Sequence, residues 1–267
     1  MSQIEKLYQA YLKGAAICTD TRGIVSGCIF FALKGANFNG NLFAATALET
    51  GAAFAVVDEK ISVVDGRLIQ VEDVLTFLQQ FAAHHRQQLK IPFIGITGSN
   101  GKTTTKELVH RVLSLKYKTL CTIGNLNNHI GVPLTLLSVN SSHEMAIIEM
   151  GANHQKEIEL LCSLAKPTHV LITNVGKAHL EGFGGFEGVK KGKGEMYAFA
   201  KANDALVFIN DDNNHLNEML GDYKNTFRYG VQDINDVTGN LLPDGTFVYL
   251  KWKSKTIDTW QTIHSQI

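Results

Sequence analysis

The chain has 267 residues, a length that fits one large or two medium-sized domains. Its 25 Lys and Arg residues balance 25 Asp and Glu residues, which argues against a generally basic nucleic-acid-binding protein. The four cysteines lack C-x-x-C spacing, and no apolar run has the length of a membrane span. The sequence therefore indicates a soluble, cytoplasmic protein with free thiols, and neither a disulfide framework nor a zinc site.

Residues 1–88 predict a small α/β domain, followed by a second domain over residues 89–267. Helical spacing is found at Ile4–Leu12, Leu42–Thr50 and Val74–Leu89, and strand-like apolar runs at Ala15–Cys18, Cys28–Leu33, Ala53–Val57 and Leu68–Val71. Two polar loops, Asp20–Arg22 and Lys34–Gly40, lie between the strands, and two plain surface turns would look the same. We interpret His84, His85 and Arg86 as a solvated helix end whose charges suit the helix dipole.

A phosphate-binding loop is predicted between an apolar strand, Ile91–Ile96, and a helix, Lys102–Leu115. Glycines in such a loop let backbone N–H groups face an anion, and the helix N-terminus adds its positive dipole end. Lys102 would reach the terminal phosphates, and the hydroxyl of Thr103 would bind Mg²⁺. The alternative is a helix start that binds nothing. The candidate nucleotide-binding residues are Gly98, Ser99, Asn100, Gly101, Lys102, Thr103 and Thr104.

Strands and helices alternate beyond this loop, which predicts a mostly parallel sheet covered by helices, with ligands at the carboxyl ends of the strands. The further strands are expected at Thr119–Ile123, Met145–Met150, His169–Val175 and Ala205–Asn210. The further helices are expected at Val132–Val139, His154–Ala165, Val189–Lys201 and Asn213–Leu220. A strand-rich end follows, with strands at Thr226–Tyr229, Asp236–Leu241 and Thr246–Lys251 and a turn at Pro243–Gly245.

Four features at predicted strand and helix ends are candidates for ligand binding. Glu149 ends an apolar strand and could hold Mg²⁺, or else cap a helix or form an ion pair. His179 lies among glycines after another strand, where a lone histidine is usually structural. Lys190, Lys191 and Lys193 would oppose the dipole at the start of a helix unless an anion or a modification is present, or they form a solvated face. Asn210 could bind a nucleoside or form a turn.

Taken together, these segments resemble the Mur ligases, the ATP-dependent amide-forming enzymes of peptidoglycan synthesis. Within that family they resemble the MurF type, which joins D-Ala-D-Ala to UDP-N-acetylmuramoyl-tripeptide. The resemblance spans nearly the whole chain, and the family's loop has the same T-G-x-x-G-K-T form. The matching segments are Asp20–Arg22, Phe30–Gly40, Thr97–Thr104, Gly124–Pro133, Glu149–His154, Ala178–Gly184 and Lys191–Glu195.

The resemblance implies ATP and Mg²⁺ as cofactors and an acyl phosphate intermediate. Thr103 and Glu149 would hold Mg²⁺, with His179 at a second metal position. Lys193 matches a lysine that is carbamylated in relatives, and Lys102 would offset phosphate charge. Thr21, Arg22 and Asn39 match the part that holds the UDP-sugar, and Asn125 and Asn128 would face that substrate between the domains. The substrates would be UDP-MurNAc-peptide and D-Ala-D-Ala.

Three other interpretations remain open at this point. A sister enzyme, such as another Mur ligase or folylpolyglutamate synthase, would share most of these motifs. A nucleotide-binding fragment without turnover is a second possibility, because the family's Gly-x-Tyr-Asn-x-x-Asn stretch and C-terminal domain lie beyond Ile267. We therefore expect the chain by itself to be an incomplete enzyme. A generic kinase is a third possibility, but the sequence shows no distinct site for an acceptor hydroxyl.

Overall fold

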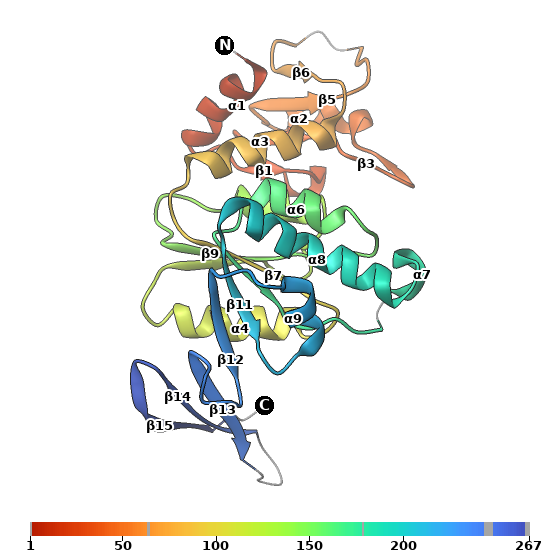
Figure 1. Cartoon of the computed structure of the whole chain (residues 1–267). Coiled ribbons are helices and arrows are strands. Elements are labelled where there is room, and N and C mark those ends of the chain that lie inside the picture. Colours follow the sequence, from red (N-terminus) through yellow and green to blue (C-terminus); the bar gives the residue numbers. More distant parts are fainter. Residues whose placement is uncertain (1, 63–64, 178, 243–247, 265–267) are drawn as a thin grey trace. The chain divides into compact units, whose positions relative to one another are not determined.

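The computed structural model describes residues 2–62, 65–177, 179–242 and 248–264 (Figure 1). The turn expected at Pro243–Gly245 and the first two residues of the strand expected from Thr246 lie outside these ranges. The chain forms two compact units, one of residues 1–90 and 129–141, the other of residues 91–128 and 142–267. The first unit thus includes a later segment that the predicted division at residue 88 assigns to the second domain.

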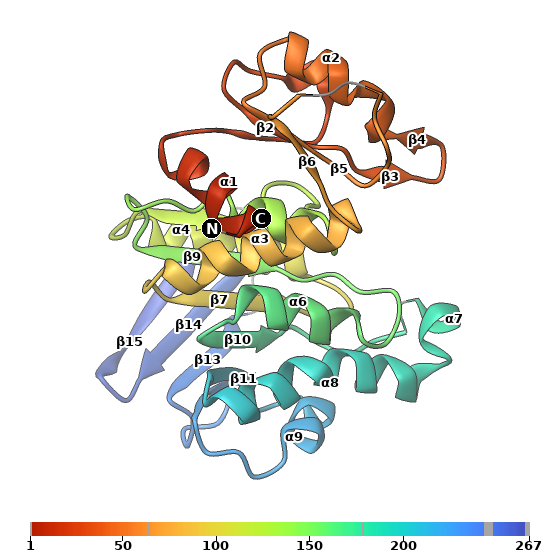
Figure 2. The ribbon, with the colours of Figure 1, turned by 90° about the horizontal axis from the view of Figure 1, so that it is seen from above.

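The first unit is built on a parallel four-stranded sheet with strand order β1-β2-β5-β6. Alternate residues of the sheet face opposite layers. Phe30 belongs to the apolar cluster with helix α2 (Ala44–Glu49), whereas the ring of Phe31 contacts Phe77 and Phe81 of α3. Figure 2 shows α2 on one side of these strands and α1 and α3 on the other. The bounds are α1 Gln3–Leu12, β1 Ile17–Cys18, β2 Ile29–Phe31, β5 Phe54–Val57, β6 Leu68–Gln70 and α3 Val74–Gln88.

Three local details of the first unit differ from the sequence prediction. The helix expected from Leu42 begins as a 3-10 turn, Gly40–Phe43, before α2. A short hairpin, β3 (Lys34–Gly35) and β4 (Phe38–Asn39), precedes it. The end of α3 is not solvated, because His85 and Arg86 are both buried. The hydroxyl of Tyr8 lies 3.0 Å from Nδ1 of His85, and Val139 O lies 2.8 Å from Nε2, so this ring helps to hold the unit's core.

The second unit is built on a nine-stranded sheet with strand order β15-β14-β13-β12-β11-β10-β7-β9-β8. The pairs from β8 to β13 are parallel, and the last two strands are antiparallel. This confirms the predicted mostly parallel sheet with a strand-rich end. The strand bounds are β7 Phe93–Thr97, β8 Thr119–Cys121, β9 Met145–Glu149, β10 His169–Ile172, β11 Leu206–Asn210, β12 Thr226–Gly230, β13 Val237–Leu242, β14 Tyr249–Ser254 and β15 Ile257–His264.

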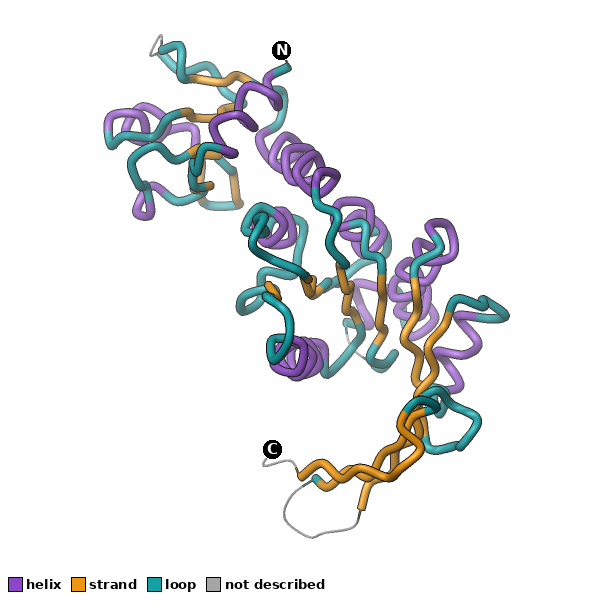
Figure 3. Tube along the Cα trace, turned by 90° about the vertical axis from the view of Figure 1, so that its left-hand side faces the viewer, coloured by secondary structure: helices purple, strands orange, loops and turns teal. Residues whose placement is uncertain are grey.

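Helices cover both faces of this sheet. Helix α4 lies on one side of β7 and β9, and α6 and α8 lie on the other (Figures 1 and 3). Strands β13 to β15 extend beyond these helices, as Figure 3 shows. Because β7 lies between β10 and β9, three strands from separate parts of the sequence end side by side. The helix bounds are α4 Lys102–Leu113, α5 Gly131–Leu136 (in the first unit), α6 Glu157–Ala165, α7 Leu180–Phe183, α8 Phe186–Asn203 and α9 Asn214–Leu220.

Candidate active site

The predicted phosphate-binding loop connects β7 to α4 at the carboxyl end of a fully buried strand. Gly98 and Gly101 have positive φ angles of 144° and 76°, which residues other than glycine rarely adopt. A Cβ on Gly98 would also lie 2.0 Å from Oγ1 of Thr173. The loop therefore requires glycine at position 98 for two independent reasons, its backbone conformation and its contact with the segment after β10.

The segment after β10 fixes the loop by hydrogen bonds. The N–H of Ser99 donates to Asn174 O at 3.0 Å, and the N–H of Asn100 donates to Asn174 Oδ1 at 3.2 Å. The hydroxyl of Thr173 donates to Asn100 O at 2.6 Å. Thr173 and Asn174 are not among the predicted site residues, although their place at the end of a strand was a usable signal.

Helix α4 begins at Lys102 and has no side-chain cap at its N-terminus. Its first turn, which includes Thr103 and the exposed Thr104, therefore presents N–H groups that an anion can accept bonds from. The ammonium of Lys102 folds back onto the loop, 2.8 Å from Gly98 O and 3.3 Å from Ser99 O. Burial lowers the pKa of Lys102, and the charge of Glu149 opposes that shift in part. The loop thus holds one cation over its own carbonyl groups.

Glu149 ends β9 beside the loop, and only 1% of its surface is exposed. Its Oε1 accepts hydrogen bonds from Asn127 Nδ2 at 2.8 Å and from the hydroxyl of Thr103 at 3.3 Å. Its Oε2 is buried without a hydrogen-bond partner in the described part of the chain, and the ammonium of Lys106 lies 4.0 Å away. A buried carboxylate oxygen without a donor is costly unless a cation binds it.

This arrangement fits a magnesium ion. The hydroxyl of Thr103 lies 3.3 Å from Oε1 of Glu149, and a hydroxyl and a carboxylate are both ligands that Mg²⁺ prefers. Thr103 and Glu149 were predicted from the sequence as metal ligands, whereas Asn127 and Lys106 were not predicted as site residues. Asn127 lies within the matching segment Gly124–Pro133, but three asparagines there gave no sign of which one contacts Glu149.

The sequence predicted the lysine cluster at the start of a helix, but in the structure it lies further along α8. The helix begins at Phe186, so Lys190, Lys191 and Lys193 lie beyond its first turn, where the dipole has little effect. Lys190 pairs with Glu187 and Glu218, each at 3.6 Å, and Lys191 is exposed. The predicted charge conflict therefore does not arise from the helix dipole.

Lys193 is nevertheless unusual, because it is 2% exposed. Its ammonium lies 3.5 Å from Ala152 O and 5.4 Å from the centre of the Phe183 ring. Ala152 follows β9 by three residues, so Lys193 lies against the segment that begins at Glu149. Burial and, second, the charge of Lys102 lower the pKa of Lys193 to about 8. About a tenth of this amine is therefore neutral at pH 7, far more than for a lysine with its ordinary pKa.

The other predicted residues of this unit are His179, Asn125, Asn128 and Asn210. His179 is exposed, has a left-handed backbone with φ of 52°, and precedes α7; among the described residues, none bonds to its ring. Asn125 and Asn128 are exposed in the turn before α5. The Oδ1 of Asn210 accepts the N–H of Asp212 at 3.1 Å, which favours the turn over a nucleoside contact.

In the first unit, Thr21 and Arg22 line a hollow of about 590 Å³ with Thr19, Asp20, Phe38 and Phe43. The rings of Phe38 and Phe43 are stacked, with centroids 5.5 Å apart. Asp20 caps the short helix Thr21–Gly23 and also pairs with the exposed guanidinium of Arg22. The hollow thus combines an aromatic pair with one accessible cation, features that suit a ring and an anionic group.

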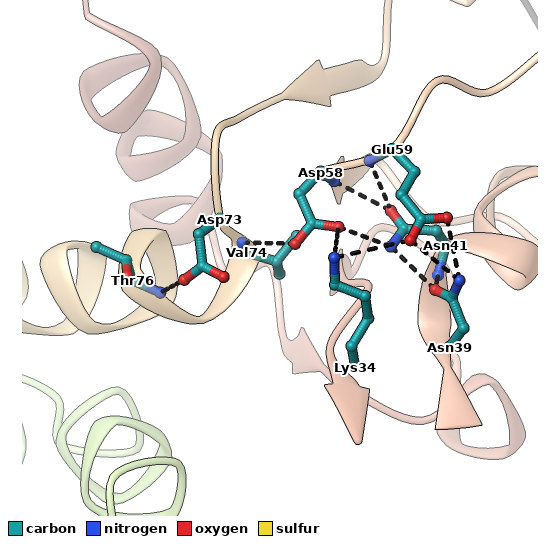
Figure 4. A network of polar contacts seen from close by, with 8 residues as sticks. All are labelled: Lys34, Asn39, Asn41, Asp58, Glu59, Asp73, Val74 and Thr76. Carbon is teal, nitrogen blue, oxygen red and sulfur yellow. Dashed lines mark hydrogen bonds and ion pairs between the residues drawn. The ribbon is translucent and has the colours of Figure 1, made fainter. Parts of the chain in front are cut away.

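Asn39, the third predicted residue of this unit, belongs to a polar network shown in Figure 4. Its Oδ1 accepts two bonds from Asn41, each 3.0 Å, and its Nδ2 donates to the Glu59 carboxylate at 3.0 and 3.2 Å. Asn41 also bonds to Asp58, whose carboxylate accepts the N–H of Val74 at 3.2 Å. Both amide atoms of Asn39 are therefore occupied within the protein.

Across the described ranges, every helix is too short or too polar to serve as a membrane span.

Two protein-family models match this chain, and both describe Mur ligases. The family model described as "Mur ligase middle domain" matches residues 96–264, and the model described as "Mur ligase family, catalytic domain" matches residues 15–86.

The chain is similar to the UDP-N-acetylmuramoyl-tripeptide–D-alanyl-D-alanine ligase of Escherichia coli. It is 41% identical over 222 residues, which cover 81% of this chain and 49% of that protein. Among solved structures it is similar to MurF from Acinetobacter baumannii (TM-score 0.83, 31% identity, 98% of this chain and 60% of that one). It is also similar to MurF ligase from Thermotoga maritima in complex with ADP (TM-score 0.84, 28% identity, 99% and 59%). The chain spans about half the length of the curated relatives.

Proposed function

The chain belongs to the Mur ligase family, and we propose that it supplies the nucleotide site and part of the substrate site of a MurF-type ligase. The reaction would join D-Ala-D-Ala to UDP-N-acetylmuramoyl-tripeptide at the expense of ATP. One observation carries the proposal: a buried carboxylate oxygen of Glu149 lacks a hydrogen-bond donor beside a glycine loop and an uncapped helix N-terminus. The relatives that bear this name, and the relative with bound ADP, support it.

The proposed first step is phosphoryl transfer. The terminal carboxylate of the peptide attacks the γ-phosphorus of ATP, the bond to the bridging oxygen breaks, and ADP leaves with that electron pair. The N–H groups of the loop and of the first turn of α4 bind the phosphates. Lys102 would turn from the carbonyl groups of Gly98 and Ser99 to a phosphate, where its charge offsets the repulsion between two anions.

The second step is amide formation. The neutral amine of D-Ala-D-Ala attacks the acyl phosphate carbon, and the tetrahedral intermediate releases inorganic phosphate and a proton. Thr103 and Glu149 would hold Mg²⁺, which when bound neutralises phosphate charge. Asn127 orients the carboxylate by donating to its Oε1. The hydroxyl of Thr122 holds the backbone of Glu149 by accepting its N–H at 3.0 Å. A place for His179 at a second metal position rests on the resemblance alone.

Lys193 is proposed to carry a carbamate. Its neutral amine would attack CO₂, forming an N–C bond and releasing one proton to solvent, and the lowered pKa supplies that amine. The carbamate would place a negative charge near Lys102, and this charge would be a second partner for the metal, beside Glu149. We expect ¹³C-labelled bicarbonate to give a carbamate NMR signal that is lost in Lys193→Ala and kept in Lys191→Ala. A spectrum without that signal, recorded at pH 8 with Mg²⁺ and nucleotide, contradicts this part.

The UDP-sugar is proposed to bind the hollow beside Thr21 and Arg22, with the stacked rings of Phe38 and Phe43 next to a flat base and Arg22 next to a phosphate. Asn39 would act by holding the loop, because both of its amide atoms are already bonded. Asn125 and Asn128 would contribute from exposed positions.

Calorimetric titration of the chain tests the binding part of the proposal. We expect Mg²⁺ with a non-hydrolysable ATP analogue to bind, and UDP-MurNAc-tripeptide to bind independently of it. Ligation of labelled D-Ala-D-Ala by the protein that carries this chain tests the reaction. Ligation of a different amino acid to a shorter UDP-MurNAc-peptide favours another Mur ligase. Glutamate addition to a folate favours folylpolyglutamate synthase. Binding without any turnover leaves a nucleotide-binding fragment.

A further inference from the structure

Three side chains that the proposed ligase reaction does not use meet behind the phosphate-binding helix. Glu107 and His110 lie one turn apart on α4, and Cys121 ends the neighbouring edge strand β8. One carboxylate oxygen, one ring nitrogen and the thiol sulfur all lie within 4.8 Å of one another. Among the described residues, this is the group of His, Cys, Asp and Glu side chains close enough to share an ion.

The hydrogen bond of His110 prepares its ring for metal binding. Nε2 lies 3.1 Å from Thr119 O, and a carbonyl oxygen only accepts, so Nε2 carries the ring proton. Nδ1 then keeps its lone pair. Metal-binding histidines commonly donate their second ring N–H to a backbone carbonyl in this way, which fixes both tautomer and ring orientation.

We propose that Glu107, His110 and Cys121 bind a divalent transition metal of the zinc class, at a site distinct from the magnesium site proposed at Glu149. A set of one thiolate, one imidazole and one carboxylate suits Zn²⁺ and Co²⁺ and disfavours Mg²⁺, which prefers oxygen ligands. Three protein ligands would leave the fourth tetrahedral position to water. None of the three side chains is fully buried, so each has room to turn toward a shared ion.

Two groups set the affinity of this site. The thiolate is the ligand form of Cys121, so the metal must displace the thiol proton to solvent. The ammonium of Lys106 now pairs with Glu107 at 3.0 Å and competes with the metal for that carboxylate. Lys106 keeps its bond to Thr122 O at 2.7 Å when Glu107 turns away, so the exchange does not leave it without a partner.

Cobalt titration of the nucleotide-free chain tests this site, because Co²⁺ bound to a thiolate has an intense near-ultraviolet absorption that oxygen ligands do not give. The titration is run with excess Mg²⁺, which occupies oxygen sites. We expect one Co²⁺ per chain with that absorption, and displacement by Zn²⁺. Cys121→Ser should abolish the absorption, and His110→Gln should weaken binding about tenfold or more.

Two matched variants keep the result specific. Cys18→Ser removes another thiol, and Glu149→Gln removes the carboxylate of the magnesium site; both should leave the cobalt absorption unchanged. Circular dichroism of each variant checks that it is folded. Absence of the thiolate absorption, its persistence in Cys121→Ser, or its loss in Glu149→Gln overturns the proposal.

Discussion

Two polar clusters, one in each unit, are built from the same kinds of side chain but differ in how completely their atoms are bonded. Around Asn41, every acceptor and donor is matched: its Oδ1 accepts two N–H groups, from Asp58 and Glu59, and its Nδ2 donates to Asn39 and Asp58 (Figure 4). Around Glu149, one buried oxygen has no hydrogen-bond donor among the described residues.

The difference separates a structural network from a binding site. A satisfied buried network stabilises the fold and leaves no capacity for a ligand. A buried group with free capacity lowers the stability of the unit by itself, and a ligand that supplies the missing partner recovers that free energy. Burial by itself raises the pKa of Asp58, but hydrogen bonds from Asn41 and Lys34 outweigh that effect, so the pKa is lowered. This is expected in a network that favours the charged form.

Asn41→Ala should disrupt the bonded cluster and should have the largest effect of the four substitutions, on the free energy of unfolding. It removes the acceptor of two backbone N–H groups, so we expect a loss of about 3 kcal/mol in the free energy of unfolding. Nucleotide binding should be unchanged. Urea denaturation measures the first and calorimetry the second. Asn125→Ala, an exposed asparagine, is the control and should stay within about 0.5 kcal/mol of the original. Equal losses in both variants would contradict the structural role.

Lys193→Met should instead stabilise the second unit, by about 2 kcal/mol at pH 7 without CO₂, because a buried ammonium is removed. The pKa of Lys193 is about 8 in the folded chain and near 10.5 in the unfolded chain, so the unfolded chain binds more protons between these values. Stability of the original protein therefore rises with pH over that window, and the advantage of Lys193→Met shrinks. Thermal unfolding from pH 7 to 10 measures this, with Lys191→Met as control. A constant difference would mean that Lys193 is not buried as an ammonium.

Lys102→Ala should weaken nucleotide binding and leave the stability of the fold nearly unchanged. Loss of a charged partner for the phosphates is worth about 2 kcal/mol, or roughly 30-fold weaker binding of the ATP analogue. Unfolding should change little, because in the described part of the chain the hydrogen bonds of Lys102 go to carbonyl groups of its own loop. Calorimetry of this variant beside Lys191→Ala measures the effect. Unchanged affinity would remove Lys102 from the site.

Glu149→Gln should give the smallest effect, confined to metal. The amide still accepts the bond from Asn127 but lacks the charge that holds a cation, so we expect the Mg²⁺ concentration for half-maximal nucleotide binding to rise about tenfold. Fold stability should hold, since a strand-end carboxylate contributes charge and little packing. Thermal unfolding and a Mg²⁺ titration measure the two. If stability collapses while the Mg²⁺ dependence stays the same, Glu149 is structural.

The sequence by itself determined what is local. The run from an apolar strand through Gly98 and Gly101 to Lys102 predicted the loop, because strand, positive φ and helix start are each written in neighbouring residues. Alternating strand and helix patterns likewise predicted the parallel sheet. Local pattern was less exact at element ends: α8 begins three residues before the predicted Val189, which removed the dipole argument for Lys193.

Only the tertiary structure decided which polar groups meet. Nothing in the sequence distinguishes Asn127, which bonds to Glu149, from Asn125, which is exposed, or shows that Asn39 is fully bonded while Glu149 is not. Cys121 comes to His110 only because β8 returns beside α4. The physical reason is that periodicity fixes which face of an element is buried, whereas the partner of a buried polar atom depends on strand order and on contacts between distant segments.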